Sequence, residues 1–299
     1  MIPSSFRKVL AVSYTRQRVE LPDSDFLDLD WSQVGARRVA VICHGLEGDS
    51  YRPYMQGMVR AFNDAGWDAA AVNSRSCSGE PNRLPRSYHS GATEDLRAAL
   101  AAVQEGEYTN IVLVGFSLGG NLVLKYLGED PAVVLPGICA SVTVSVPVDL
   151  AETSLVLVQP SNRIYHDRFL RKLRKKIRAK AALMPDQLDA SPLAHVRTLI
   201  DFDDQFTGPL HGFADAADYY ARNSARNWLD QISVPTLLLT ATNDPIQSPD
   251  CYPREVATAS QHFHLEETAW GGHVGFRLAG PQYYSEIRAL AFVSEVCGV

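Results

Sequence analysis

Ser117 stands at the centre of a Gly-x-Ser-x-Gly motif that spans residues 115–119. The apolar, β-branched run 111–114 before it predicts a buried strand, and residues 121–128 after it predict a helix. Because the two glycines lack a Cβ atom, strand and helix can approach closely while the serine adopts a strained conformation with its hydroxyl pointing outward. This is the pattern of a nucleophile elbow. A glycine-rich turn without chemistry has the same pattern, so the serine's partners decide between the two.

A serine hydroxyl becomes a good nucleophile when a histidine takes its proton and a carboxylate fixes the tautomer of that histidine. In folds with this elbow, the acid and then the histidine follow the serine in chain order. Asp244 comes just after the predicted strand 236–239, and Pro245 enforces a turn there. We therefore predict Asp244 as the acid. Two alternatives stay open: the Asp-Pro pair can be simple turn chemistry, and Asp149 also follows a strand end.

Eight histidines compete for the role of the base. His273 lies beyond the last predicted strand, in the glycine-rich segment AWGGHVGF, where a flexible loop can carry an imidazole over the sheet. His262 and His264 alternate within that strand, so they are expected to be ordinary strand residues. The sequence therefore predicts His273 as the base.

The negative charge that develops on an attacked carbonyl oxygen needs backbone N–H donors. The Leu118 amide, directly after the serine, is one predicted donor, and the Leu46 amide in the loop HGLEGDS is the other. His44 in that loop is expected to shape it by hydrogen bonding. A metal site formed by His44 with Glu47 or Asp49 lacks an evident third ligand, so we expect neither a metal nor a cofactor.

The elements that must position these residues follow from the hydrophobic pattern. Two short alternating runs within residues 16–31 predict an antiparallel hairpin. From residue 38 onward, short apolar runs alternate with helix-period segments, which predicts a mostly parallel sheet of about eight strands covered by helices on both faces. The chain is thus expected to be one α/β domain, residues 1–299.

The alternation stops between Asp149 and Trp228, where the chain is polar, aromatic and helix-rich. Ligands bind above the strand ends of open α/β sheets, so residues 149–228 are predicted to form a helical cap over the site. The aromatic and leucine side chains of this segment either shape an apolar acyl pocket or only pack; they are Phe169, Phe202, Phe206, Leu210 and Phe213. The three aspartates of DFDDQF are expected to stay solvated.

The segment RFLRKLRKKIRAKAAL within the predicted cap is an amphipathic, strongly basic helix. Its basic face is expected to be solvated, and the alternative is a surface that touches a membrane transiently. The net charge of −6 gives no general attraction to nucleic acid or to anionic membranes. Five scattered cysteines without a CxxC pair are typical of a reducing compartment, and the amino terminus lacks the apolar core of a signal peptide. We expect a soluble, cytoplasmic protein.

Several segments together resemble the YheT-type hydrolases, a branch of the α/β-hydrolase superfamily. They are HGLEGDS, CSGEPNRLPRSYHSG, GFSLGGN, FTGPLHGF with DYY after it, NDP and GGHVGF, spread from about residue 18 to about residue 276. The resemblance implies a triad of Ser117, Asp244 and His273, and activity on short- or medium-chain carboxylic esters. Two departures are a short amino terminus without the H-x-Q-T segment, and Ser76 in a position where glycine is common.

Three functions remain at this stage. The first is a serine carboxylic-ester hydrolase with a small acyl ester as its substrate. The second is an acyltransferase that passes the acyl group from the same acyl-enzyme to an alcohol. The third is a non-catalytic binding protein that keeps the fold, and the ordered set of serine, aspartate and histidine argues against it.

Overall fold

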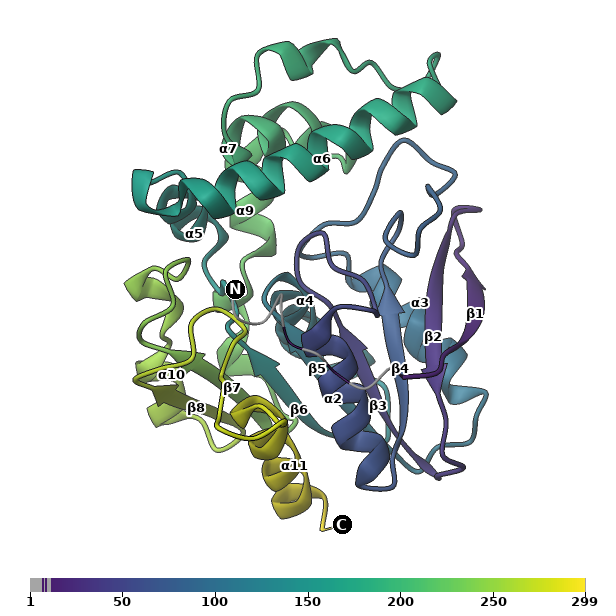
Figure 1. Ribbon diagram of the computed structural model, residues 1–299, viewed down its shortest axis with the longest axis vertical. Coiled ribbons are helices and arrows are strands. Elements are labelled where there is room, and N and C mark those ends of the chain that lie inside the picture. Colours follow the sequence, from purple (N-terminus) through teal and green to yellow (C-terminus); the bar gives the residue numbers. More distant parts are fainter. Residues whose placement is uncertain (1–6, 8, 10–11, 299) are drawn as a thin grey trace.

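A computed structural model describes residues 7, 9 and 12–298 and shows a central sheet with helices on both sides (Figure 1). Within this described part, eight strands form one sheet in the order β1-β2-β4-β3-β5-β6-β7-β8. The strands are β1 Thr15–Glu20, β2 Phe26–Ser32, β3 Arg38–Cys43, β4 Asp68–Asn73, β5 Asn110–Phe116, β6 Ile138–Val144, β7 Thr236–Ala241 and β8 Phe263–Thr268. The predicted α/β fold with its mostly parallel sheet is confirmed.

Most of the parallel strands are deeply buried. Strands β3 to β8 pair in parallel, and β4 and β7 are buried at every position, as expected for apolar strands covered on both faces. The predicted hairpin is also confirmed: β1 and β2 pair antiparallel, with Glu20 opposite Phe26 at the turn. Strand β2 then pairs antiparallel with β4, which attaches the hairpin to the parallel part.

The sheet divides the apolar core into two layers. One layer lies under α2 (Pro53–Asp64) and α11 (Tyr284–Cys297). The other lies under α3 (Thr93–Gln104) and α4 (Leu118–Glu129), with α10 (Arg254–Ala259) at its edge. Helices cover both faces, so the strand ends are the part of the sheet that is open to a ligand.

A helical segment separates β6 from β7 and lies above the sheet in Figure 1. We call its helices the cap: α5 Leu150–Leu157, α6 Arg163–Leu183, α7 Leu199–Phe202, α8 Gly208–Leu210 and α9 Ala216–Asn223. A π-helical turn, Asp203–Thr207, joins α7 to α8. The cap has an apolar cluster of its own, with Leu170, Ile177 and Phe202 among its members. The helical insertion predicted from the sequence is therefore present.

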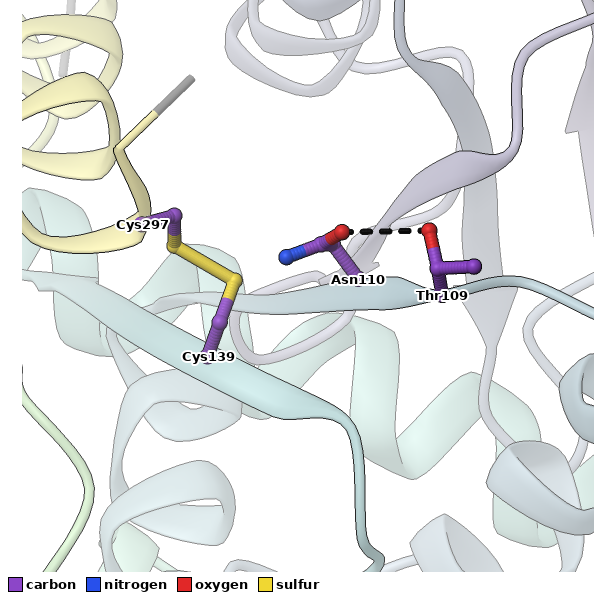
Figure 2. The surroundings of a disulfide bond; sticks show 4 residues. All are labelled: Thr109, Asn110, Cys139 and Cys297. Carbon is purple, nitrogen blue, oxygen red and sulfur yellow. Dashed lines mark hydrogen bonds between the residues drawn. A yellow bond between two sulfur atoms is a disulfide. The ribbon is translucent and has the colours of Figure 1, made fainter.

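A disulfide joins Cys139 on β6 to Cys297 at the end of α11 (Figure 2). The other cysteines, Cys43, Cys77 and Cys251, are free. The scattered spacing predicted no pair, because the two partners are 158 positions apart and meet only when the last helix packs on the sheet. Within the described residues, no helix combines the length and the apolar character needed to cross a bilayer.

Candidate active site

Ser117 occupies a sharp turn between the end of β5 and the start of α4. Its φ of +52° and ψ of −119° lie outside the regions that most side chains adopt. Space explains the glycines around it: a Cβ at Gly115 would lie 2.6 Å from the carbonyl oxygen of Gly119, and a Cβ at Gly119 would lie 2.5 Å from that of Cys43. The strand and helix therefore meet through backbone alone, and the serine side chain is carried at the strand end.

The structure brings Ser117, His273 and Asp244 together, although they are far apart in sequence. Nε2 of His273 lies 2.8 Å from Oγ of Ser117, and Nδ1 lies 2.8 Å from Oδ2 of Asp244. Each residue follows the carboxyl end of a parallel strand, β5, β7 or β8, and these ends share one edge of the sheet. Histidine and aspartate are buried, so the carboxylate is shielded from water where it faces the imidazole. The carboxylate accepts Nδ1–H, which leaves Nε2 free to accept the serine proton.

Asn243 holds the histidine loop, and sequence reasoning did not single it out. Its side-chain oxygen accepts hydrogen bonds from the Gly271 and Gly272 amides, at 3.0 and 2.8 Å. Asn243 thereby ties the loop of His273 to the turn that carries Asp244. The one sequence feature that pointed to Asn243 was its position directly before the predicted acid. Its hydrogen-bond partners lie 28 and 29 positions further along the chain, so spacing did not reveal them.

The alternatives to this acid and base have other roles. Asp149 caps α5 through the Glu152 amide and pairs with Arg226. His262 and His264 are exposed on or beside β8. Within the described residues, no group of three or more histidine, cysteine or acidic side chains is placed to hold a metal ion.

The two predicted oxyanion donors lie beside Ser117. Leu118 begins α4, and Leu46 lies in a turn closed by a 2.9 Å hydrogen bond from the Gly48 amide to the Gly45 carbonyl. Both residues line a cavity with Ser117 and His273. In the described part of the chain, neither amide donates to a backbone or side-chain acceptor. Both are thus available to an oxygen bound next to the serine.

His44 shapes the loop that carries Leu46, as the sequence predicts. Its Nε2 accepts a hydrogen bond from the Ser74 amide at 3.2 Å, and its Nδ1 lies 2.8 Å from the Gly45 carbonyl oxygen. Burial lowers the pKa of His44 to about 4, so the ring is neutral and fits one donor and one acceptor. Ser76, in the next loop, takes φ +61°, the left-handed conformation that explains why glycine suits this position.

The cavity above Ser117 is walled mainly by the cap. Four of the five apolar side chains predicted to shape a pocket line it, namely Phe169, Phe202, Phe206 and Leu210. Phe213 packs instead against His89 and Tyr219, with ring centroids 5.5 Å away in each case.

The three aspartates of DFDDQF are half-buried, contrary to the expectation that they stay solvated. Asp203 lies in the π-helical turn and lines the cavity, where Thr207 Oγ1 and Tyr220 OH donate to its carboxylate at 2.6 and 2.7 Å. Burial raises the pKa of Asp203 to about 6. The wall is therefore apolar with one carboxyl group set into it.

Comparisons with known proteins agree with this geometry. The family model described as the alpha/beta hydrolase fold matches residues 39–277. The chain belongs to the α/β hydrolase family. The chain is 38% identical over 298 residues to "Putative esterase YheT" of Escherichia coli, covering 96% of this chain and 87% of that protein. The resemblance to YheT-type hydrolases is thereby confirmed.

More distant relatives share the family. Phospholipase ABHD3 of Mus musculus is 27% identical over 276 residues, which cover 89% of this chain and 67% of that protein. Monoacylglycerol lipase of Saccharomyces cerevisiae is 28% identical over 277 residues, with 89% and 60% covered. Among solved structures, the Pyrococcus furiosus esterase Pf2001 superposes with a TM-score of 0.65 at 16% identity, covering 97% of this chain and 96% of that one. That likeness supports the fold.

Proposed function

We propose that this α/β hydrolase is a serine carboxylic-ester hydrolase. The observation that carries the proposal is the continuous hydrogen-bonded line from Ser117 through His273 to Asp244, with two unused amides beside the serine. The relatives named as esterase, phospholipase and monoacylglycerol lipase support the same class of reaction. A non-catalytic binding protein would have no need for this arrangement.

The reaction follows from the positions of these groups. Ser117 Oγ attacks the acyl carbonyl carbon while His273 Nε2 takes its proton, and Asp244 stabilises the resulting imidazolium. The amides of Leu118 and Leu46 bind the oxyanion of the tetrahedral intermediate. Its collapse breaks the ester bond, and His273 returns the proton to the departing alcohol. Water then attacks the acyl-enzyme with His273 as base, releasing the acid and restoring Ser117.

The cavity supports a small acyl ester as the substrate. We assign the whole chain, residues 1–299, to a single domain and its residues 149–228 to the cap. The wall that the cap gives the cavity is mainly apolar and suits a short or medium acyl chain. The chain's net charge of −6 argues against nucleic acid as a partner. We also propose a cytoplasmic location, because scattered cysteines are typical of a reducing compartment. The Cys139–Cys297 disulfide argues in the other direction, since such bonds are a feature of oxidising compartments.

A series of p-nitrophenyl esters from acetate to palmitate tests activity and pocket depth together. We expect a maximum at short or medium length, and a loss of at least about 10³-fold in kcat for Ser117→Ala or His273→Ala. A fluorophosphonate probe should label the wild type and not Ser117→Ala. Equal labelling of both proteins, or less than a tenfold loss in His273→Ala, would contradict the assignment.

Transfer to an alcohol is the second candidate, because the apolar wall of the cavity can limit the access of water to the same acyl-enzyme. Adding ethanol in excess to the p-nitrophenyl ester assay separates the two. Free acid as the main product identifies a hydrolase, and ethyl ester as the main product identifies an acyltransferase.

A further inference from the structure

The turn that carries Leu46 is held in an unfavourable backbone conformation. Glu47, the residue after the predicted oxyanion donor, takes φ +54°, the left-handed region that a side chain other than glycine seldom occupies. Gly45, the residue before Leu46, is held by the core because its amide donates to the Tyr54 hydroxyl at 3.1 Å. Glu47 must therefore be held by contacts of its own if the Leu46 amide is to keep its direction.

Two of those contacts come from the cap and the others from the core. Lys176 on α6 donates to Oε1 of Glu47 at 2.6 Å, and Lys172, one helical turn earlier, donates to the Glu47 carbonyl oxygen at 2.9 Å. Tyr88 completes the arrangement: its hydroxyl accepts from the Glu47 amide at 2.7 Å and donates to Oε1 at 3.0 Å. Arg52 adds a longer bond to the carbonyl oxygen, at 3.2 Å.

This ion pair is shielded from water, unlike most lysine contacts on a helix surface. The side chains of Lys176 and Glu47 are 15% and 8% exposed, so their interaction is screened less than a surface pair. Lys180, two turns after Lys172, is fully buried and donates to Asn82 and to the carbonyl oxygens of Pro85 and Arg86. One lysine stripe at helical spacing thus fastens α6 to two loops of the core.

We propose that Lys176 is a positioning residue that acts through Glu47 on the Leu46 amide, so that seating of the cap completes the oxyanion hole. The inference rests on the proposed function, since it requires an oxyanion to form beside Ser117. When α6 lies on the core, Lys172 and Lys176 hold Glu47 in its left-handed conformation. When α6 moves away, Glu47 keeps only its bonds to Tyr88 and Arg52, and the Leu46 amide is free to turn from the serine.

The direct test is Lys176→Met, which removes the charge and keeps most of the apolar stem. With p-nitrophenyl butyrate we expect kcat to fall about tenfold with KM within twofold of wild type. The loss is smaller than the 10²- to 10³-fold that follows removal of a donor, because the Leu46 amide is displaced and not deleted. Inhibition by butylboronic acid, whose adduct with serine places an oxygen in the oxyanion hole, should weaken by a similar factor.

Two variants separate positioning from a merely structural role. Lys176→Arg keeps a charged donor and should restore kcat to within threefold of wild type. Lys175→Met, which changes an exposed neighbour on the same helix, should match wild type.

Glu47→Gln tests whether Lys176 acts through Glu47. It should reproduce the loss in kcat, and the double variant with Lys176→Met should lose no more than either single variant. Glu47→Gln also serves as the test if Lys176→Met does not fold.

The opposite results are equally clear. Wild-type kcat in Lys176→Met, or a rise in KM alone, would overturn the inference and leave Lys176 as a wall residue of the cavity. Failure of the Arg variant to restore kcat would also count against it. If the wild type itself hydrolyses no ester and binds no fluorophosphonate, the proposed function fails, and the inference fails with it.

Discussion

Asp203 is a carboxyl group in an otherwise mainly apolar cavity wall, and among the described residues it has no ion-pair partner. Two hydroxyl groups donate to it, yet burial still raises its pKa to about 6, from an ordinary value of 3.8. The folded protein therefore binds a proton at this site between about pH 4 and pH 6, whereas the unfolded chain does not. Stability contributed by this group is present below pH 4 and is lost as the pH rises through 6.

Asp203→Asn should remove that pH dependence, because an amide is neutral at every pH and still presents an oxygen to one hydroxyl. We expect the variant to be more stable than wild type by about 1–2 kcal/mol at pH 8 and nearly equal to it at pH 4. Urea unfolding of both proteins at pH 4, 6 and 8 measures the difference. A gap that stays constant over this range would show that the carboxyl group does not titrate between the two states.

At the residue scale, sequence reasoning singled out groups that follow a strand end. It named Ser117, Asp244 and His273, and the structure places all three in one hydrogen-bonded line. It did not find Asn243, because the amides that Asn243 binds lie in a different loop. Polar partners across loops depend on tertiary contacts, which spacing along the chain does not encode.

The elbow is the element on which the site depends most. Strand β5 and helix α4 meet so closely that a Cβ at Gly115 would lie 2.6 Å from both Gly119 O and Gly120 Cα. These are backbone atoms, so no side chain can rotate to make room. The direction of the Leu118 amide is set by the same packing.

Gly115→Ala should consequently damage stability and activity together. We expect a loss of about 2–3 kcal/mol in the free energy of unfolding, as overpacking of a tight core contact produces. We also expect a fall of more than tenfold in ester hydrolysis, because α4 must shift with its first amide. Gly280→Ala is the matched control, since among the described residues no atom beyond its chain neighbours lies within 4 Å of the added Cβ, and it should change stability by less than about 0.5 kcal/mol. Equal behaviour of the two variants would refute the packing argument.

The cap shows why an element can be predicted while its orientation cannot. Helical spacing identified the basic amphipathic helix, which is now α6, and predicted a solvated charged face. In the structure Lys172, Lys176 and Lys180 point to core loops instead, and Lys180 is fully buried. Their acceptors include backbone carbonyl oxygens and the side chains of a glutamate and an asparagine, whose positions depend on the folded core. The helical spacing therefore predicted the helix, but it did not predict which of the basic side chains face water.

At the scale of the whole molecule, the fold was predicted because its signals are local and repeated. Strands that are apolar at nearly every position, separated by helix-period segments, leave few arrangements other than a covered parallel sheet. Long-range ties were missed. Arg75 is buried and pairs with Asp23, Asp25 and Asp95, which joins the hairpin turn to α3. The first two partners lie 52 and 50 positions before it, so nothing near Arg75 in sequence points to them.

The longest tie is the disulfide between Cys139 and Cys297, which fastens the last helix to the middle of the sheet. Closing a loop of 158 residues lowers the entropy of the unfolded chain, so we expect the bond to stabilise the protein by about 2–4 kcal/mol. Cys297→Ser should lose that amount in urea unfolding, Cys139→Ser should lose a similar amount, and the double variant should lose little more than either. Dithiothreitol should lower wild-type stability to the level of the variants and leave the variants unchanged. The opposite outcome is a wild-type stability that dithiothreitol does not change, together with five thiols that titrate in denaturant before any reduction. It would show that the cysteines are unpaired in the isolated protein, and it would favour the reducing compartment that their scatter predicts.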